Sequence, residues 1–393
     1  MGAVSEQTKA IMEALGAFGE FGTDEALWEA LRRPEACDFM FGNPHDVAPQ
    51  AYVDALVRAA QPTGKDHYAY TMDLPEAVVS IGEDLRGRFP VAFRDEDIHL
   101  TNGNFVGLAI ALRTLVDPGD EVIFVSPPWF FYEALIVGSG ATPVRVYADR
   151  ATYALDLEAL AAAVTPRTRA VIVNSPNNPS GRIYPVEVLD ALATLLDEAS
   201  DRHGRRIYLL SDEAYSRIVF DDRDFPTPVA YYPYSFLLYT YAKTLLAPGS
   251  RLGYIALPPS MPERDTLRDA MLVAQIATGW AFPVAPLQYA VPGLERLTVD
   301  LKTLQRRRDL LCTALRDQGY DLVVPEGTFY ITVRSPIPDD LAFCGRLTDH
   351  GVFVLPGAMF ELPGWFRVSV TASDEMVDRG IPGFAAAIAS TRA

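Results

Sequence analysis

The sequence predicts an α/β protein with two domains: a large one built on a doubly wound, mostly parallel sheet, and a smaller α+β domain. The chain has 393 residues, which is more than one small core accommodates. Through the middle of the chain, short apolar runs alternate with helical patterns, as in sheets whose parallel strands are joined by right-handed helical crossovers. After Pro283 this alternation gives way to long helices and scattered strands.

The composition excludes several classes of partner. Apolar residues make up 49% of the chain and charged residues 22%, which is typical of a soluble globular protein. A net charge of −17 argues against binding to nucleic acid or to an anionic membrane, because both would be repelled. No apolar stretch is long enough to span a bilayer, and residues 1–10 lack the pattern of a signal peptide. Cys37, Cys312 and Cys344 are widely spaced and indicate a reducing compartment, so we expect a cytoplasmic protein.

The N-terminal part should be helical and then irregular. Residues 1–40 have an amphipathic helical pattern. Gly42, followed by Asn43 and Pro44, predicts a turn in which the backbone comes close to another group. A second irregular stretch ends at Pro75, where proline suits the first turn of a helix.

A strand, a glycine loop and a helix follow one another at residues 97–115. The strand is expected at 97–100 and the helix at 106–115, with Gly103 in the loop between them. Such a loop directs free amides and the positive end of the helix dipole at an anion. The glycine spacing differs from that of the dinucleotide fingerprint.

Polar and aromatic residues then gather after successive strands. We expect strands at 121–125, 144–147, 169–174 and 206–210, and helices at 156–164 and up to about residue 200. Trp129, Asn178, Asp212 and Tyr215 each follow one of these strands. Ligands of doubly wound sheets bind beyond the carboxyl ends of the strands, so the sequence predicts a binding site along this edge.

Lys243 belongs to the same edge. It lies in a loop between two apolar runs, 234–239 and 252–257, which we interpret as buried strands. A desolvated lysine amine loses its proton more readily and can attack a carbonyl. Arg251, eight residues further, carries a fork of donors suited to phosphate. These residues alone leave two interpretations open: a Schiff-base lysine beside a phosphate-binding arginine, or a surface loop with two unrelated cations.

The C-terminal part is expected to form the smaller domain. Its predicted helices are 294–319, 339–349 and 373–390, and its predicted strands are 322–324, 329–333 and 366–370. Arg367 is a cation in an apolar strand and needs an anionic partner, either a structural carboxylate or a substrate carboxylate. We place the large domain at residues 46–288 and the small one at 1–45 and 289–393, with the N-terminal segment packed against the latter.

Three motifs carry a resemblance to a known family. They are Ser175-Pro-Asn-Asn-Pro-Ser-Gly181, Ser211-Asp-Glu-Ala-Tyr215, and Ala242-Lys243 followed by Pro248-Gly249-Ser-Arg251-Leu-Gly253. In this order and spacing they resemble the class I/II aminotransferases of pyridoxal phosphate (PLP) fold type I, especially the bacterial aspartate and aromatic branch. The resemblance extends from about residue 39 to 374 and implies the fold, PLP as cofactor, and ping-pong transfer of an amino group between an L-amino acid and a 2-oxo acid.

The resemblance also implies roles for individual residues. Lys243 looks like the lysine of the internal aldimine and the base that moves a proton at the substrate Cα. Asp212 resembles the carboxylate that pairs with the pyridinium nitrogen. Tyr215 and Asn178 look like donors to the phenolic oxygen of the cofactor, and Trp129 looks like the residue that stacks on its ring.

The remaining roles concern the phosphate and the substrate. The phosphate site would comprise Gly103, Asn104, Phe105, Thr240 and Arg251. Arg367 resembles the clamp on the substrate α-carboxylate, and Gly42 and Asn178 would lie beside that carboxylate. Tyr68 matches a tyrosine that reaches the phosphate in the neighbouring subunit, which implies a homodimer with shared sites.

The sequence departs from the family pattern around the substrate. The family usually has glycine at Asp73, small or polar residues at Asn104 and Phe105, and aspartate at His45. Phe105, Phe130, Tyr132, Trp280, Phe282 and Phe360 form either an apolar wall or ordinary core packing. No second cation for an acidic substrate is evident, which favours a neutral or aromatic side chain.

Other functions remain to be weighed. A PLP-dependent lyase, decarboxylase, cyclase or oxidase would share every cofactor residue. A PLP-binding regulator would need an appended DNA-binding domain, for which residues 1–39 leave no room. The five histidines show no metal-ligand spacing, so we expect no metal site.

Overall fold

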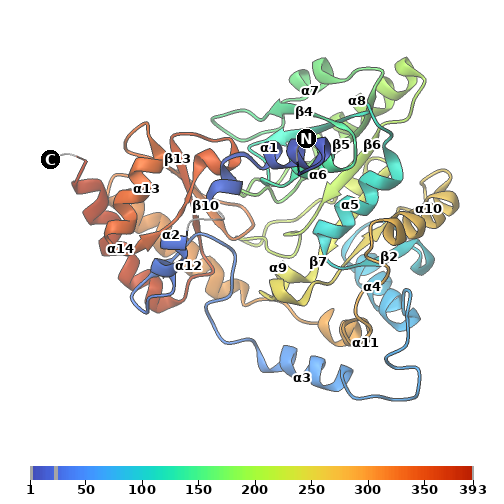
Figure 1. Ribbon diagram of the computed structural model, residues 1–393, viewed down its shortest axis with the longest axis horizontal. Helices are drawn as coiled ribbons and strands as arrows, with labels where there is room; N and C mark the ends of the chain where they lie inside the picture. The colour runs from blue at the N-terminus through green and yellow to red at the C-terminus, as the bar shows by residue number, and fades with distance from the viewer. Residues whose placement is uncertain (1–2, 22–24, 392–393) are drawn as a thin grey trace.

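The computed structural model describes residues 3–21 and 25–391, which contain three β-sheets (Figure 1). The largest has seven strands in the order β2-β8-β7-β6-β5-β3-β4. These strands are β2 (Ile98–Thr101), β3 (Glu121–Ser126), β4 (Thr142–Tyr147), β5 (Thr168–Asn174), β6 (Tyr208–Asp212), β7 (Ser235–Thr240) and β8 (Gly253–Ala256).

The large sheet is mostly parallel, as predicted. Only β8 runs antiparallel to its neighbours β2 and β7, and the pairs from β7 across to β4 are all parallel. The register aligns the strand ends: Asn174 lies opposite Asp212, and Thr240 lies opposite Gly253. The residues that follow these strands are therefore brought to one edge of the sheet.

Helices cover both faces of this sheet because its buried side chains alternate between two cores. Val122 and Phe124 point to one core and Ile123 and Val125 to the other. The first face carries α5 (Asn104–Leu115), α6 (Tyr132–Gly138) and α10 (Arg264–Ala277). The second carries α3 (Gln50–Ala59), α4 (Pro75–Arg88), α7 (Leu157–Ala163), α8 (Val186–His203) and α11 (Ala285–Leu294).

A second body of structure lies at the other end of the molecule, in orange and red in Figure 1. Its four-stranded antiparallel sheet has the order β12-β13-β10-β9. These strands are β9 (Leu322–Val323), β10 (Tyr330–Arg334), β12 (Leu355–Pro356) and β13 (Trp365–Ser369). The helices α12 (Leu301–Asp317), α13 (Asp340–Asp349) and α14 (Asp374–Ala389) pack around it, and Phe343, Phe366 and Phe384 lie in its core.

One predicted helix of this part has the wrong start. The predicted helix 294–319 is interrupted, because α11 ends at Leu294 and α12 begins only at Leu301. Asp300 caps α12 by accepting from the backbone N–H groups of Lys302 and Thr303. The apolar periodicity is continuous across 295–300, and the capping aspartate is the signal that marks the boundary.

The N-terminal segment divides between the two bodies. Helix α1 (Glu6–Phe21) lies beside α6, where Gln7 Nε2 donates to the Gly138 carbonyl over 3.1 Å (Figure 1). After α2 (Glu25–Leu31), β1 (Cys37–Asp38) pairs with β11 (Val352–Phe353). Helix α1 also contacts η4 (Gly357–Phe360), and Phe18 packs against the apolar cluster that contains Phe360, so α1 touches the smaller part as predicted and α6 in addition. The expected helix over residues 1–40 ends at Leu31.

The division at residues 46–288 stays a prediction. Residues 1–2, 22–24 and 392–393 of the predicted small domain lie outside the described residues.

The short elements are α9 (Tyr241–Thr244) and the 3₁₀ turns η1 (Asp95–Asp97), η2 (Pro228–Ala230), η3 (Pro248–Ser250) and η4 (Gly357–Phe360). Within the described part of the chain, no helix combines the length and apolar character needed to cross a bilayer.

Candidate active site

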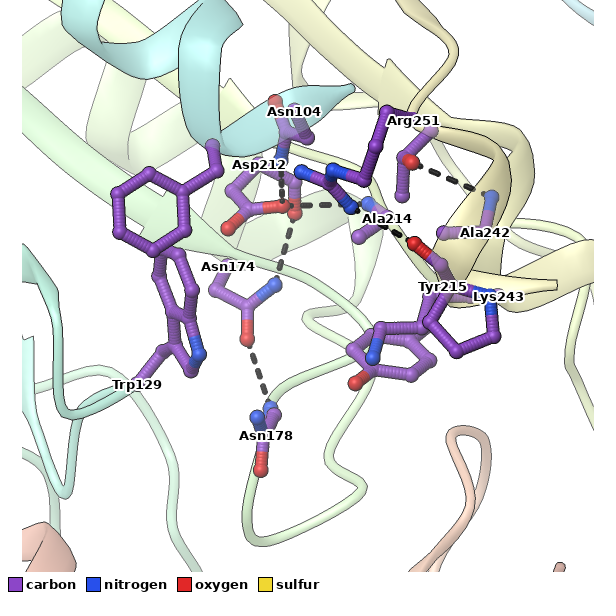
Figure 2. Close-up of a pocket in the computed structure, with 13 residues that line it drawn as sticks. Asn104, Trp129, Asn174, Asn178, Asp212, Ala214, Tyr215, Ala242, Lys243 and Arg251 are labelled. Atoms are coloured by element: carbon purple, nitrogen blue, oxygen red, sulfur yellow. Dashed lines mark hydrogen bonds between the residues drawn. The ribbon is translucent and has the colours of Figure 1, made fainter. Parts of the chain in front are cut away.

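A pocket opens at the carboxyl edge of the large sheet, where the sequence predicts a binding site (Figure 2). Its lining comes from the ends of β5, β6 and β7 and from the starts of α5 and α9. It comprises Asn104, Phe105, Trp129, Asn174, Asn178, Asp212, Ala214, Tyr215, Thr240, Ala242, Lys243, Pro248 and Arg251. Nine of the predicted site residues therefore meet in one pocket, although their roles stay predictions.

Asp212 forms the back of the pocket at the end of β6. Its Oδ1 accepts from Asn104 Nδ2 at 2.7 Å and from the Ala214 N–H at 3.2 Å. Its Oδ2 accepts from the Tyr132 hydroxyl at 2.5 Å. Burial raises the pKa of Asp212, and these hydrogen bonds together with Lys243 offset only part of that rise. Three neutral donors thus hold the carboxylate in one orientation.

Lys243 lies in the short helix that directly follows β7. It belongs to the short helix α9 rather than to a loop, and Thr240 Oγ1 caps that helix by accepting from the Ala242 N–H. The Lys243 Nζ lies 5.7 Å from the centre of the Tyr215 ring. The amine is partly buried and faces the same pocket as Asp212.

An anion cradle lies beside Lys243. Helix α5 starts at Asn104, and its N-cap Gly103 has φ 89° and supplies no side chain to cap the first amides. A Cβ on Gly103 would lie 2.9 Å from Arg251 Nη2, and one on Gly253 would lie 3.1 Å from the Asn104 nitrogen. Glycine at both positions lets uncapped amides and the guanidinium approach one point, which suits a phosphate. Thr240 lines the pocket here, but its hydroxyl donates to the Leu252 carbonyl.

A chain of amide groups links Asp212 to Arg367. Asn174 Nδ2 donates to the Asp212 carbonyl at 2.9 Å, and its Oδ1 accepts from the Asn178 N–H at 2.7 Å (Figure 2). The Asn178 Oδ1 in turn accepts from Arg367 Nη1 at 2.9 Å. The loop after β5 therefore connects the pocket with the strand β13.

Arg367 is buried without a carboxylate partner among the described residues. Only 2% of it is exposed. Its Nη2 donates to the Met40 carbonyl, its guanidinium lies 3.8 Å from the centre of the Tyr330 ring, and its Nε has no partner. Burial lowers the pKa of Arg367. An unpaired buried cation of this kind is a strong candidate for binding a substrate carboxylate.

Gly42 lies close to Tyr330, whose ring contacts Arg367. A Cβ on Gly42 would lie 2.9 Å from the Tyr330 hydroxyl, so the backbone has room only for glycine. The Tyr215 hydroxyl donates to that of Tyr330 over 3.5 Å. Burial would raise the pKa of Tyr330, but the cations Lys243 and Arg367 bring it below its ordinary value.

Sequence reasoning missed three residues of this site: Tyr132, Asn174 and Tyr330. Tyr132 was considered only for an apolar wall, yet its hydroxyl binds Asp212. Tyr330 lies on β10 two positions from Thr332, the register partner of Arg367, and so on the same face of the sheet. That alternation could have identified Tyr330, whereas no local pattern distinguishes Tyr132 from a core tyrosine.

Three other aromatic residues lie away from the pocket within one chain. Tyr68 is 60% exposed, and its hydroxyl donates to the Ala60 carbonyl. It shares a second hollow with Trp280 and Phe282, so within one chain these two lie apart from the pocket, and their place in an apolar wall stays a prediction. Asp73, which departs from the family pattern, accepts from the Leu100 N–H and so anchors β2. No cluster that could hold a metal ion occurs in residues 3–21 and 25–391.

Comparison with known proteins gives consistent matches. Residues 43–383 match the family model described as aminotransferase class I and II. The aspartate/prephenate aminotransferase of Thermus thermophilus is 32% identical over 355 residues, which cover 88% of this chain and 89% of that one. An aspartate aminotransferase of Rhizobium meliloti is 32% identical over 372 residues, 88% of this chain and 86% of its own.

Solved structures agree with these matches. An amino transferase from Eubacterium rectale superposes with a TM-score of 0.89 at 30% identity, over 99% of both chains. The Thermus thermophilus aspartate aminotransferase with maleate gives 0.82 at 28% identity, over 98% of this chain and all of the other.

Proposed function

The chain belongs to the class I and II aminotransferase family and is an aminotransferase of the aspartate and aromatic branch; from this premise we propose that it carries PLP on Lys243. It moves an amino group between an amino acid and a 2-oxo acid. The observation that carries the proposal is the convergence of Lys243, Asp212 and the Gly103–Arg251 cradle in one pocket. The relatives are named as aminotransferases, which gives no support to a lyase, decarboxylase, cyclase or oxidase.

The residues of the pocket fit PLP in three respects. The uncapped amides of α5 and the Arg251 guanidinium would hold the phosphate. The Asp212 carboxylate, whose orientation three neutral donors fix, would face the ring nitrogen, and its negative charge would favour a proton there. Trp129 would stack on the ring, and Tyr215 and Asn178 would donate to its phenolic oxygen. When bound, PLP supplies an electron sink for the negative charge that develops at the substrate Cα.

The protein groups then perform binding and proton transfer. Arg367 exchanges its bonds to Asn178 and Met40 for a bidentate grip on the substrate α-carboxylate. Gly42 lets the backbone lie beside that carboxylate. The Lys243 amine, which faces the same pocket, would serve as the base that takes up and returns the proton of the substrate Cα.

We further propose a homodimer in the cytoplasm. The exposed Tyr68, which no contact brings to its own pocket, supports a role in the site of a second copy. The three cysteines, all unpaired and buried, support a reducing compartment.

The test is covalent trapping of the cofactor at Lys243. Borohydride treatment of the PLP-loaded protein should add the reduced cofactor to the peptide that contains Lys243, and Lys243→Ala should abolish this adduct. Turnover should fall by about 10⁴-fold or more, as for other removed nucleophiles. Lys302→Ala, at an exposed position of α12, is the matched control. An adduct that persists in Lys243→Ala would disprove the assignment.

A second measurement tests transamination itself. An amino acid donor should convert the bound cofactor to its amine form, and a 2-oxo acid should restore the original absorbance. If no 2-oxo acid restores it, the chain performs a different PLP reaction.

A further inference from the structure

Phe105 and Trp129 line the pocket, and further aromatic rings that have no cofactor role continue outward from them. Phe131 lies 5.1 Å from Phe105 and 5.2 Å from Trp129, measured between ring centres. Phe130 follows at 4.7 Å from Phe131, and Phe18 of α1 stacks on Phe130 at 4.3 Å with an angle of 16°. A continuous series of rings therefore runs from the pocket to the N-terminal helix.

The same rings reach the surroundings of Arg367. Phe360 of η4 lies 5.9 Å from the Arg367 guanidinium and is buried. It belongs to one apolar cluster with Met40, against which Phe18 and Phe130 pack. We call Phe18, Phe105, Phe130, Phe131 and Phe360 the aromatic wall. It connects the candidate carboxylate site with the ring-stacking residue Trp129.

The charged groups next to the wall do not favour an acidic substrate. Arg145 lies beside the wall and already pairs with Glu133 at 2.5 Å and with Glu361 at 2.7 Å. Glu133 belongs to α6, close after Phe131, and Glu361 follows Phe360 directly. This triad carries a net negative charge, so a second carboxylate would meet repulsion as well as the loss of its hydration.

We propose that the preferred amino donor has a bulky, uncharged side chain, aromatic or long aliphatic, and that Phe130 and Phe18 select it. This inference rests on the proposed transamination at the same pocket. With the α-carboxylate on Arg367 and the amine at Lys243, the substrate side chain lies along the aromatic wall. Burial of its apolar surface against the wall stabilises the complex, whereas a carboxylate would lose its hydration there without finding a partner.

The first experiment compares ligands and donors on the PLP-loaded enzyme. The unreactive acids 3-phenylpropanoate and succinate are titrated, and binding is followed by the change in cofactor absorbance. Phenylalanine, leucine, alanine, aspartate and glutamate are then compared as donors by the rate of cofactor conversion. We expect 3-phenylpropanoate to bind at least tenfold more tightly than succinate, and phenylalanine to exceed aspartate at least tenfold in kcat/KM. Preference for the dicarboxylic compounds in either series would overturn the inference and leave the proposed function standing.

The second experiment assigns the preference to the wall. Phe130→Ala and Phe18→Ala should lower kcat/KM for phenylalanine by about 10- to 100-fold, the range for lost apolar contacts in a specificity pocket. The rate with alanine should stay within about threefold, which also shows that each variant is folded. Phe130→Leu should keep most of the phenylalanine rate. Tyr147→Ala removes an aromatic ring, 53% exposed, outside the wall and is the matched control.

The two proposals fail in different ways. Equal losses with phenylalanine and alanine in the wall variants would overturn the wall as the selecting surface. Failure of every donor, alanine included, to convert the cofactor in the unmodified enzyme would instead disprove the proposed function.

Discussion

The floor of the pocket and the aromatic wall that continues from its rim are built by different means. The floor comprises Asp212, Lys243, Asn174 and Asn178, which lie at the ends of parallel strands or within four residues after them. Hydrogen bonds orient most of its groups. The aromatic wall comes from α1, the loop after β3, the start of α5 and η4, and ring packing holds it together. The floor is thus defined by strand pairing, and the wall by contacts between distant segments.

The difference separates chemistry from selectivity. Hydrogen bonds are directional, so the floor holds its charged groups in a set geometry toward any substrate. Apolar contacts are non-directional and scale with buried area, so the wall responds to the size of the substrate side chain. Substitutions in the floor should therefore affect all donors equally, and those in the wall should change the ratio between donors.

After Lys243, the largest effect within the floor is expected at Asp212. Asp212→Asn keeps the shape but removes the anion that would face the ring nitrogen. We expect kcat/KM to fall by about 10²- to 10³-fold, comparable with the loss of a preorganised electrostatic group, and equally for phenylalanine and alanine. The measurement is the rate of cofactor conversion with each donor at saturating PLP. Asp197→Asn, on the exposed face of α8, is the control, and a loss confined to one donor would contradict the division.

A smaller effect is expected at Asn104. Asn104→Ala removes one of three donors to Asp212 and leaves those of Tyr132 and Ala214. We expect a fall of about 10-fold in kcat/KM for all donors, because a hydrogen bond to a charged group contributes about 1.5 kcal/mol at the lower end of its range. The pH at which the bound cofactor changes its absorbance should also shift, since the Asp212 carboxylate loses one hydrogen-bond donor and interacts differently with the ring nitrogen. An unchanged profile would indicate that Asn104 only fills space.

The smallest effect on activity is expected beneath the floor, at Glu213. Burial raises the pKa of Glu213 to about 7 despite hydrogen bonds from the Thr227 and Ser211 hydroxyls. Between its ordinary value of 4.5 and about 7, the folded protein keeps a proton that the unfolded chain has lost. Stability from this group therefore falls as pH rises through that window, by roughly 3 kcal/mol in total.

Glu213→Gln removes this dependence. The variant should keep the donor preferences and the turnover of the parent enzyme, while its free energy of unfolding becomes flatter between pH 5 and 8. Urea unfolding at both pH values measures the difference. If parent and variant show the same pH dependence, Glu213 is ionised throughout and its predicted role in stability is wrong.

The sequence by itself determined the parts of the site that depend on local order. Apolar runs placed the strands, and the polar residues after them, among them Asp212 and Lys243, had to meet because parallel strands share one carboxyl edge. The phosphate cradle was predicted for another reason: Arg251 precedes the antiparallel strand β8, and its role came from the guanidinium chemistry and from the resemblance to the family motif. Strand pairing and short loops leave few alternatives, so these positions could be predicted without a structure.

Only the tertiary structure decided which distant side chains complete that edge. It brought the Tyr132 hydroxyl to Asp212 and the Tyr330 ring to the Arg367 guanidinium. It also placed α1 on α6 and assembled the aromatic wall from rings such as Phe18 and Phe130. In sequence these aromatic residues look like ordinary core. Apolar contacts are non-directional, so nothing in the sequence specifies which distant ring an aromatic side chain will contact. These contacts are set only when the whole chain has folded.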